Sequence, residues 1–213
     1  MNKLSCIVSN EALTKVIKNN LVIRNPLIRK YAVQPGEQLS ILLREGAIDR
    51  ARWGFSRPTN TESRLLSVDY TKVHLKPSFR MSFRKKRCLV IADSFYIWSQ
   101  DSPIPERIFD DKNKPLLIPA VLQLSEDINE VAIITRRSRS SFSRIVDSEP
   151  VLFSDNQVET WLNEDCSIDD LMLILNSTMP KPLKRSITNN KILVYGFNDR
   201  ILHEMHKSQP SLF

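Results

Sequence analysis

The segment from Phe83 to Gln100, FRKKRCLVIADSFYIWSQ, joins residue types that could hold an anionic, flat ligand. Four consecutive cations at 84–87 lead into the apolar run 88–92. This run meets Asp93 and is followed by the aromatic-rich stretch 95–98. A buried strand with cations at its start and aromatic rings at its end is typical of the wall of a nucleic-acid cleft. The segment therefore raises nucleic acid as a ligand class.

Cations and acids are segregated along the chain, which carries a net charge of +7. Residues 71–92 contain no acid and seven cations: Lys72, Lys76, Arg80, Arg84, Lys85, Lys86 and Arg87. Residues 131–146 contain no acid and four cations: Arg136, Arg137, Arg139 and Arg144. Such segregation is what a one-sided basic surface requires, although solvated loops without a partner would give the same pattern.

Trp53 and Trp98 are two aromatic residues that could accompany these basic stretches. Each could be a core residue. Each could instead be a platform for base stacking, which contributes roughly 1–3 kcal/mol per base. Spacing alone leaves both interpretations open.

Other chemistries find little support in the residue pattern. His203 and His206 are three residues apart but have no third ligand at matching spacing, so no metal site is expected. The chain has four glycines and no glycine-rich phosphate loop, and no cofactor is expected. The three cysteines Cys6, Cys88 and Cys166 are far apart, which favours reduced thiols. Without a long apolar run or a signal-like N-terminus, the expected location is cytoplasmic, with no membrane contact.

Many short strands and a few helices are predicted, which indicates one α+β domain over residues 1–213. Its centre would be an antiparallel, partly barrel-like sheet with flanking helices. Apolar or β-branched runs predict strands at 4–8, 39–43, 65–70, 87–92, 94–98, 115–123, 130–135 and 191–197. Helices are predicted at 10–19, 154–162 and 168–175, with Asn10, Asp155 and Ser167 as N-cap residues, and a surface loop at 99–114.

The order of several motifs resembles the SOS-response-associated peptidase (SRAP) family. The matching segments span nearly the whole chain: 34–38 (QPGEQ), 52–55 (RWGF), 76–80 (KPSFR), 87–98 (RCLVIADSFYIW), 133–135, 145–152 and 161–162. The resemblance implies the single-domain SRAP fold. It also implies the family's activity, which is recognition of single-stranded DNA and covalent cross-linking to abasic sites.

The residues that carry the family's chemistry are replaced here. The family's Cys after the initiator Met, and its Asn, Glu and His, correspond to Asn2, Ser67, Ile97 and Val146. Isoleucine and valine cannot move a proton, so the resemblance implies no catalytic residue in this chain. Two substitutes remain conceivable: the amine of Met1, and the thiol of Cys6, which lies about 13 Å further along a strand.

Several positions that contact DNA in the family are retained. The nucleic-acid-binding set expected from the resemblance and the basic stretches is Trp53, Arg84, Lys85, Arg87, Trp98, Thr135 and Arg136. Against binding, Leu4 and Asp69 stand where the family has arginines. The sequence thus predicts a catalytically degenerate, monomeric protein of the SOS response that binds single-stranded DNA. The alternatives are a protein-interaction scaffold, or residual cross-linking through the N-terminal amine.

Overall fold

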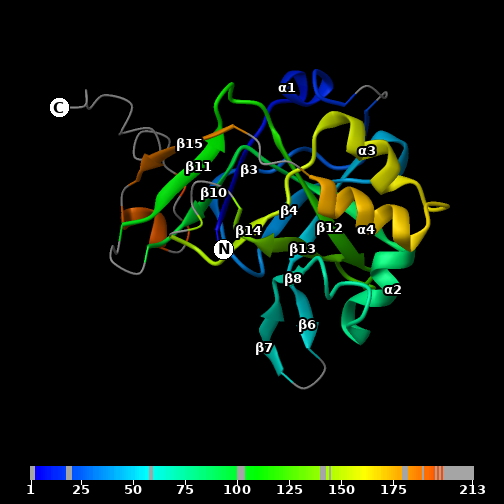
Figure 1. Ribbon diagram of the computed structural model, residues 1–213. Coiled ribbons are helices and arrows are strands. Elements are labelled where there is room, and N and C mark those ends of the chain that lie inside the picture. Colours follow the sequence, from blue (N-terminus) through cyan, green and yellow to red (C-terminus); the bar gives the residue numbers. More distant parts are fainter. Residues whose placement is uncertain are drawn as a thin grey trace.

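The computed structural model describes residues 3–17, 21–57, 60–99, 104–139, 143, 145–178, 182–188, 190–194, 196 and 198. These residues form an α+β domain with two main β-sheets, a two-stranded hairpin and four α-helices (Figure 1). The α-helices are α1 (Asn10–Thr14), α2 (Pro77–Lys85), α3 (Asp155–Leu162) and α4 (Ile168–Ser177), and the 3-10 helices are η1 (Arg44–Gly46) and η2 (Asn190–Leu193).

The larger sheet closes on itself. Its eight strands run in the order β14-β13-β12-β9-β4-β5-β2, with β8 paired to β13. A further parallel pairing of β13 with β5 turns β13-β12-β9-β4-β5 into a ring, so the predicted barrel-like sheet is confirmed. Its strands are β2 (Val22–Ile23), β4 (Gln38–Leu42), β5 (Ala47–Trp53), β8 (Ser67–Asp69), β9 (Arg87–Ala92), β12 (Leu116–Gln123), β13 (Glu130–Arg137) and β14 (Ser148–Pro150).

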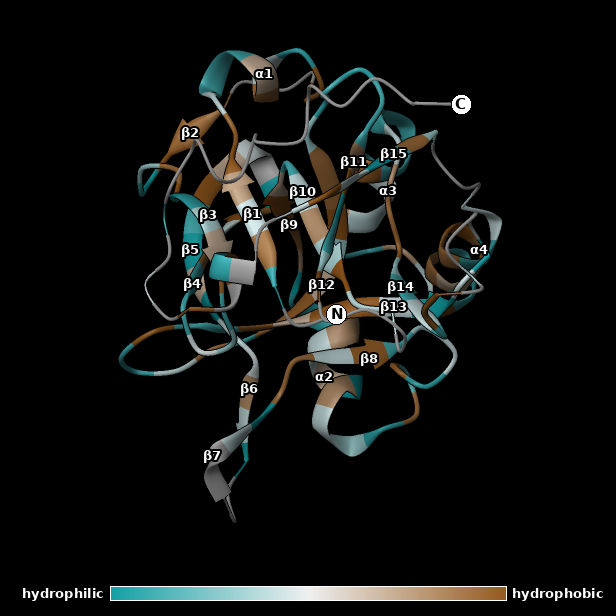
Figure 2. Ribbon diagram, turned by 90° about the vertical axis from the view of Figure 1, so that its left-hand side faces the viewer, coloured by the Kyte–Doolittle hydropathy of each residue, from teal (hydrophilic) through white to brown (hydrophobic). Residues whose placement is uncertain are grey.

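The smaller sheet has five strands in the order β15-β11-β10-β1-β3, all antiparallel. They are β1 (Leu4–Ile7), β3 (Arg29–Val33), β10 (Ser94–Ile97), β11 (Glu106–Asp110) and β15 (Leu183–Ile187). The hairpin of β6 (Phe55–Arg57) and β7 (Asn60–Leu65) projects from the body of the molecule (Figure 1). Figure 2 shows hydrophobic residues concentrated in the central strands of the two sheets.

Two apolar clusters hold these layers together. One lies where the helices pack on the ring and contains Phe79 and Phe83 of α2 and Trp161 of α3. The other joins strands of both sheets, from Leu4 of β1 to Ile133 of β13. Ile97 is a member of this second cluster, and Val146 packs against it.

Local sequence signals explain the helix ends. In α2, Pro77 occupies the first helical position, and Phe79 and Phe83 are four residues apart and therefore share the inward face. Ser154 and Gln157 form a capping box at the start of α3, and the Ser167 side chain accepts a hydrogen bond from Asp170 N at the start of α4. The predicted Ser167 cap is confirmed.

Gly54 is required by the backbone between β5 and β6. Its φ of +99° lies in the region that side chains avoid, and an added Cβ would approach Arg64 Cβ to 2.7 Å and the Leu66 side chain to 2.8 Å. The Gly54 amide donates to Val131 O and keeps the hairpin against β13, while the Arg64 guanidinium donates to Gly54 O within the hairpin.

Several predicted elements differ from the structure. The helix expected at 10–19 ends at Thr14 and has Ser9, not Asn10, as its N-cap, and α3 is capped by Ser154 rather than Asp155. The strand expected at 65–70 is divided at Leu66 between β7 and β8. Serine caps in both helices because its short side chain reaches back to the free amides of the first turn.

Two further expectations are wrong, and one helix is missing from the prediction. The loop expected at 99–114 contains β11, and the final strand expected at 191–197 begins as η2, although residues 195 and 197 lie outside the described part. Helix α2 was not predicted, because its many cations mask the inward spacing of Phe79 and Phe83. Among the described residues, no helix combines the length and apolar character needed to cross a bilayer.

Candidate nucleic-acid interface

Ile97 and Val146, which the resemblance aligns with the family's catalytic Glu and His, are apolar residues with apolar neighbours. Ile97 in β10 is 3% exposed and belongs to the cluster that contains Leu4, which is fully buried. Val146, which is half-buried, packs against the same cluster. The place where the resemblance implies acid–base groups is therefore filled by packed aliphatic side chains. Asn2 and Met1 lie outside the described residues.

Ser67, Asp69 and Thr135 lie together where β8 and β14 flank β13. Ser67 pairs with Ile133 and Asp69 with Thr135, which in turn pairs with Pro150. Ser67 is exposed, whereas Thr135 is buried. The Asp69 carboxylate accepts hydrogen bonds from the amide and hydroxyl of Thr71, so it closes its own turn.

The two tryptophans occupy different environments. Trp53 is fully buried, and its indole N–H donates to Leu66 O at 3.2 Å. Trp98 is half-buried and packs against Ala32, Tyr96 and Ile192. In this structure Trp53 is a core residue, which is one of the two interpretations the sequence allowed, and it offers no ring face to a base.

Arg87 and Arg136 are inside the molecule. Arg87 is 8% exposed. Its guanidinium donates to four main-chain carbonyls, those of Trp161, Phe83, Arg84 and Asn163. Arg136, 3% exposed, donates to Glu149 at 3.2 Å and to Thr178 O at 2.7 Å. Both cations join distant segments of the chain, and both are too deeply buried to meet a phosphate at the surface.

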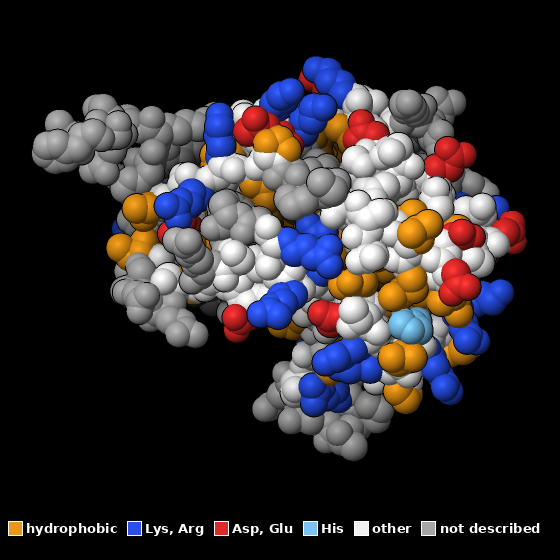
Figure 3. Space-filling view, in the orientation of Figure 1, with side chains coloured by type: hydrophobic (Ala, Val, Ile, Leu, Met, Phe, Trp, Pro, Cys, Tyr) orange, Lys and Arg blue, Asp and Glu red, His pale blue; other side chains and the backbone are white. Residues whose placement is uncertain are grey.

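Arg84 and Lys85, by contrast, are exposed in the last turn of α2. The rest of the exposed cations near them come from the same acid-free stretch: Lys72, Lys76, Arg80 and Lys86. Figure 3 shows Lys and Arg side chains gathered at the edge of the molecule where Figure 1 draws α2, with hydrophobic side chains beside them. The structure thus separates the exposed cations of α2 from the apolar cluster at Ile97.

Burial makes the cysteines poor nucleophiles. It raises the pKa of the Cys6 thiol well above its ordinary value, with Asp93 adding to the effect, and it raises the pKa of the fully buried Cys88 thiol as well. Protonated, inaccessible thiols do not attack an aldehyde. Cys6 therefore does not replace the missing cysteine.

Asp93 itself is structural. Its carboxylate accepts from Ile7 N at 2.7 Å, from Ser94 Oγ at 3.0 Å and from Arg107 at 2.7 Å. These bonds tie β1, β10 and β11 together. Within the described residues no cluster of three or more His, Cys, Asp or Glu could hold a metal ion, and His203 and His206 lie outside them.

Lys3 is a buried amine one residue before β1. The residue is 6% exposed, and among the described residues its Nζ has no hydrogen-bond partner. Burial lowers the pKa of this amine, Glu37 opposes the shift, and Lys30 adds to it. Lys30 and Glu37 are themselves paired at 2.5 Å.

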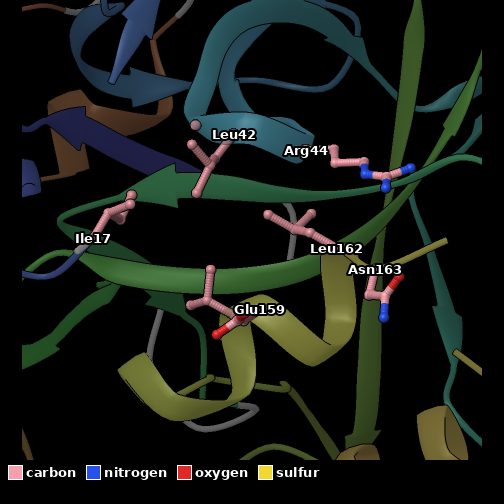
Figure 4. Close-up of a pocket in the computed structure, with 8 residues that line it drawn as sticks. Ile17, Leu42, Arg44, Glu159, Leu162 and Asn163 are labelled. Carbon is pink, nitrogen blue, oxygen red and sulfur yellow. The ribbon is translucent and has the colours of Figure 1, made fainter. Parts of the chain in front are cut away.

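One cavity, of about 490 Å³, lies between the hairpin and α2, and is lined by Phe55, Ser56, Arg57, Leu65, Lys76, Ser78, Phe79 and Gln123. A smaller cavity of about 280 Å³ lies between β4, η1 and α3. In Figure 4 the apolar side chains of Leu42 and Leu162 flank this smaller cavity, while the charged end of Arg44 points away from them. Its lining holds no set of groups that converge on one point.

Lys76, the N-cap of α2, forms a unit with Arg80 and Arg84 that the basic composition of the segment does not reveal. The three residues are four apart, which on a helix places them in one row. Pro77 and the spacing of Phe79 and Phe83 are the sequence signals that indicate α2. Together they would have revealed the row, which the charge pattern alone does not show.

Comparisons with known proteins agree with the motif match. The model of the family described as SOS response associated peptidase (SRAP) matches residues 2–190. Abasic site processing protein YobE of Bacillus subtilis is 30% identical over 151 residues, which cover 62% of this chain and 68% of that protein. Abasic site processing protein YoaM of the same organism is 27% identical over 164 residues, covering 68% and 71%. The matches thus span about two thirds of these relatives.

Solved structures share the fold at low identity. A protein from Bacteroides thetaiotaomicron superposes with a TM-score of 0.75 at 18% identity, covering 95% of this chain and 97% of the other. A phage-related protein from Bordetella bronchiseptica superposes with a TM-score of 0.73 at 19% identity, covering 89% and 94%. Because the family model matches residues 2–190 of this chain, the chain belongs to the SRAP family.

Proposed function

We propose that this SRAP-family protein binds single-stranded DNA without forming a covalent cross-link to abasic sites. The observation that carries the proposal is the pairing of two features. Leu4, Ile97 and Val146 pack into one apolar cluster where the family has polar groups, while Arg84 and Lys85 stay exposed in an acid-free stretch. The named activity of its relatives, abasic site processing, makes DNA the ligand class to test first.

The loss of chemistry follows from the residue types. Cross-linking needs a nucleophile and groups that transfer protons during imine formation. Aliphatic side chains at 97 and 146 supply neither, and the thiol of Cys6 is buried. Electrostatic attraction to phosphates needs only exposed cations, so it survives the loss of the reactive set.

The test combines binding and trapping on the full chain. Fluorescence anisotropy with a labelled single strand, a duplex and a strand containing an abasic site is measured across a salt series. The abasic strand is also incubated with borohydride and resolved on a denaturing gel. We expect single strands to bind better than duplex, with log K falling by about 0.7 per phosphate contact for each tenfold rise in salt, and no trapped adduct.

Two alternatives are decided by the same experiment. A trapped adduct would show residual cross-linking through an amine, for which the N-terminal amine is the first candidate. No binding of any strand at low salt would favour a protein-interaction scaffold, an alternative that the apolar filling around Ile97 and the exposed Leu75 and Met81 support.

A further inference from the structure

We infer that the cavity between the β6–β7 hairpin and α2 receives one nucleotide of the bound strand, and that the row Lys76, Arg80 and Arg84 carries the phosphates that follow. The inference rests on the proposed function, and it names a path for the strand that runs along α2 rather than through the apolar cluster at Ile97. Three observations carry it: the chemistry of the cavity lining, the geometry of the row, and the lack of acids among the described lining residues.

The cavity has the composition of a nucleotide site. Its volume of about 490 Å³ lies in the range of small-ligand pockets, about 300–1,000 Å³. The apolar part of the lining is Phe55, Leu65 and Phe79. The two phenyl rings are 5.3 Å apart and belong to residues only 1% and 2% exposed, so the half-buried Leu65 is the apolar side chain most open to a base. The rim is polar and is formed by Ser56, Arg57, Lys76, Ser78 and Gln123.

The charge of the lining is positive. Arg57 and Lys76 are exposed cations, and none of the lining residues that the structure describes is an acid. The nearby Glu130 carboxylate is already held by Arg64 at 2.7 Å and by the amide and hydroxyl of Ser56. An apolar side chain for a base, amide and hydroxyl groups for its edge, and two cations for a phosphate match one nucleotide.

The row continues from the cavity along α2. Lys76 lines the cavity, and Arg80 N donates to Lys76 O at 2.9 Å, so the two residues are one helical turn apart. Arg84 follows four residues later, about 6 Å along the helix axis. All three side chains belong to exposed residues, and in the described part of the chain none has an ion-pair partner.

An acidic protein segment is the competing occupant of this surface. Leu75 and Met81, which are 64% and 61% exposed, would suit its apolar side chains. The cavity favours nucleic acid over an acidic protein segment. A base could enter the cavity and contact its polar rim, while the phosphate of the same nucleotide meets Lys76, where the row begins. The two occupants are separated below by competition.

The experiment compares matched variants by fluorescence anisotropy with a labelled oligothymidylate. Ser78→Trp, at the second position of α2, fills the cavity mouth, and Asn156→Trp, at the second position of α3, is its control. Lys76→Gln/Arg80→Gln/Arg84→Gln neutralises the row, and Lys15→Gln/Lys112→Gln/Lys114→Gln removes the same charge from exposed sites elsewhere. Circular dichroism and thermal melts establish that each variant is folded.

We expect Ser78→Trp to weaken binding about tenfold, because the indole excludes one nucleotide from the cavity, and Asn156→Trp to leave it unchanged. Neutralising the row should reduce the slope of log K against log salt by about 2, since each phosphate contact contributes about 0.7. The charge-matched control should change the slope far less. Polyglutamate should compete with the labelled strand less well than unlabelled oligothymidylate.

The outcomes separate this inference from the proposed function. If the wild-type protein binds no strand, the proposed function fails and this inference fails with it. If the wild-type protein binds but Ser78→Trp and the row variant match their controls, only the path along α2 is overturned. If polyglutamate competes better than oligothymidylate, the surface fits an acidic protein, which also overturns the inference.

Discussion

Arg87 and Lys3 show two ways in which this fold buries a cation. The Arg87 guanidinium donates to four carbonyls in α2, α3 and the turns that follow them, so its burial is compensated. The Lys3 amine has no hydrogen-bond partner in the described part of the chain. A buried donor without a partner costs free energy, whereas a satisfied one stabilises the segments it joins. The two residues should therefore respond to substitution in opposite directions.

Replacing Arg87 by lysine should destabilise the protein by about 2–4 kcal/mol, because the ammonium cannot reach the four carbonyls and leaves most of them unpaired. Urea denaturation measures the loss. At a temperature where the variant is folded, its affinity for single-stranded DNA should equal that of the wild type, since Arg87 is buried. Weaker DNA binding by a fully folded Arg87→Lys would instead place this side chain in the interface.

Lys3→Met should stabilise the protein by about 1–3 kcal/mol at neutral pH, because a thioether fills the same space without an unpaired donor. Burial lowers the pKa of Lys3 from the ordinary 10.5. Between the lowered pKa and 10.5 the unfolded chain binds more protons, so the wild-type stability should rise with pH across that window. Melting curves over alkaline pH should show this rise in the wild type and not in Lys3→Met. A destabilised Lys3→Met would mean that the amine has a partner.

At the scale of the elements, apolar patterning identified most central strands, and partners distant in sequence decided the rest. The β-branched runs of β9, β12 and β13 are evident in the sequence because these strands are buried on both faces. β11 was missed because its pairing with β10 and β15 depends on residues far along the chain. Arg87 was assigned to DNA because its partner Trp161 is 74 residues away.

Glu130 ties the β6–β7 hairpin to β13, and the wall of the proposed nucleotide cavity depends on this contact. Burial alone would raise the pKa of Glu130, but hydrogen bonds from Ser56 and Arg64 hold it below the ordinary 4.5. The stabilisation is therefore present above pH 4.5 and is lost as pH falls through the lowered pKa.

Glu130→Gln should cost about 1.5–3 kcal/mol at neutral pH, the range for hydrogen bonds to a charged group, and should flatten the acid part of the stability profile. Denaturant melts at neutral and acid pH check both effects. Hydrogen exchange at the amide of Ser56, which donates to Glu130 at 2.8 Å, should accelerate in the variant. Unchanged exchange there would show that the hairpin is held by its main-chain bonds alone.

At the scale of the whole molecule, the apolar cluster around Ile97 joins the two sheets and is part of the core. It includes Leu4 and Ile97 from the smaller sheet and Trp53, Val90 and Ile133 from the ring. A catalytic cleft at this place needs polar groups and water, whereas a core needs close packing. If the chain lacks cross-linking activity as proposed, the apolar residues at 4, 97 and 146 predict that a single polar substitution will not introduce it.

Ile97→Glu, which places a carboxylate at this position, should destabilise the protein by about 4 kcal/mol. Burial raises the pKa of a glutamate by roughly 3, and each pKa unit corresponds to about 1.4 kcal/mol. Folded domains are stable by only about 5–15 kcal/mol, so this change threatens the whole fold. Ile97→Leu, which keeps the volume, should cost less than about 1.5 kcal/mol. Thermal and urea melts of the two variants measure the difference, and borohydride trapping with an abasic strand should give no adduct for either. If Ile97→Glu were as stable as the wild type, this part of the molecule would have to be hydrated, and a residual reaction centre would again have room to act.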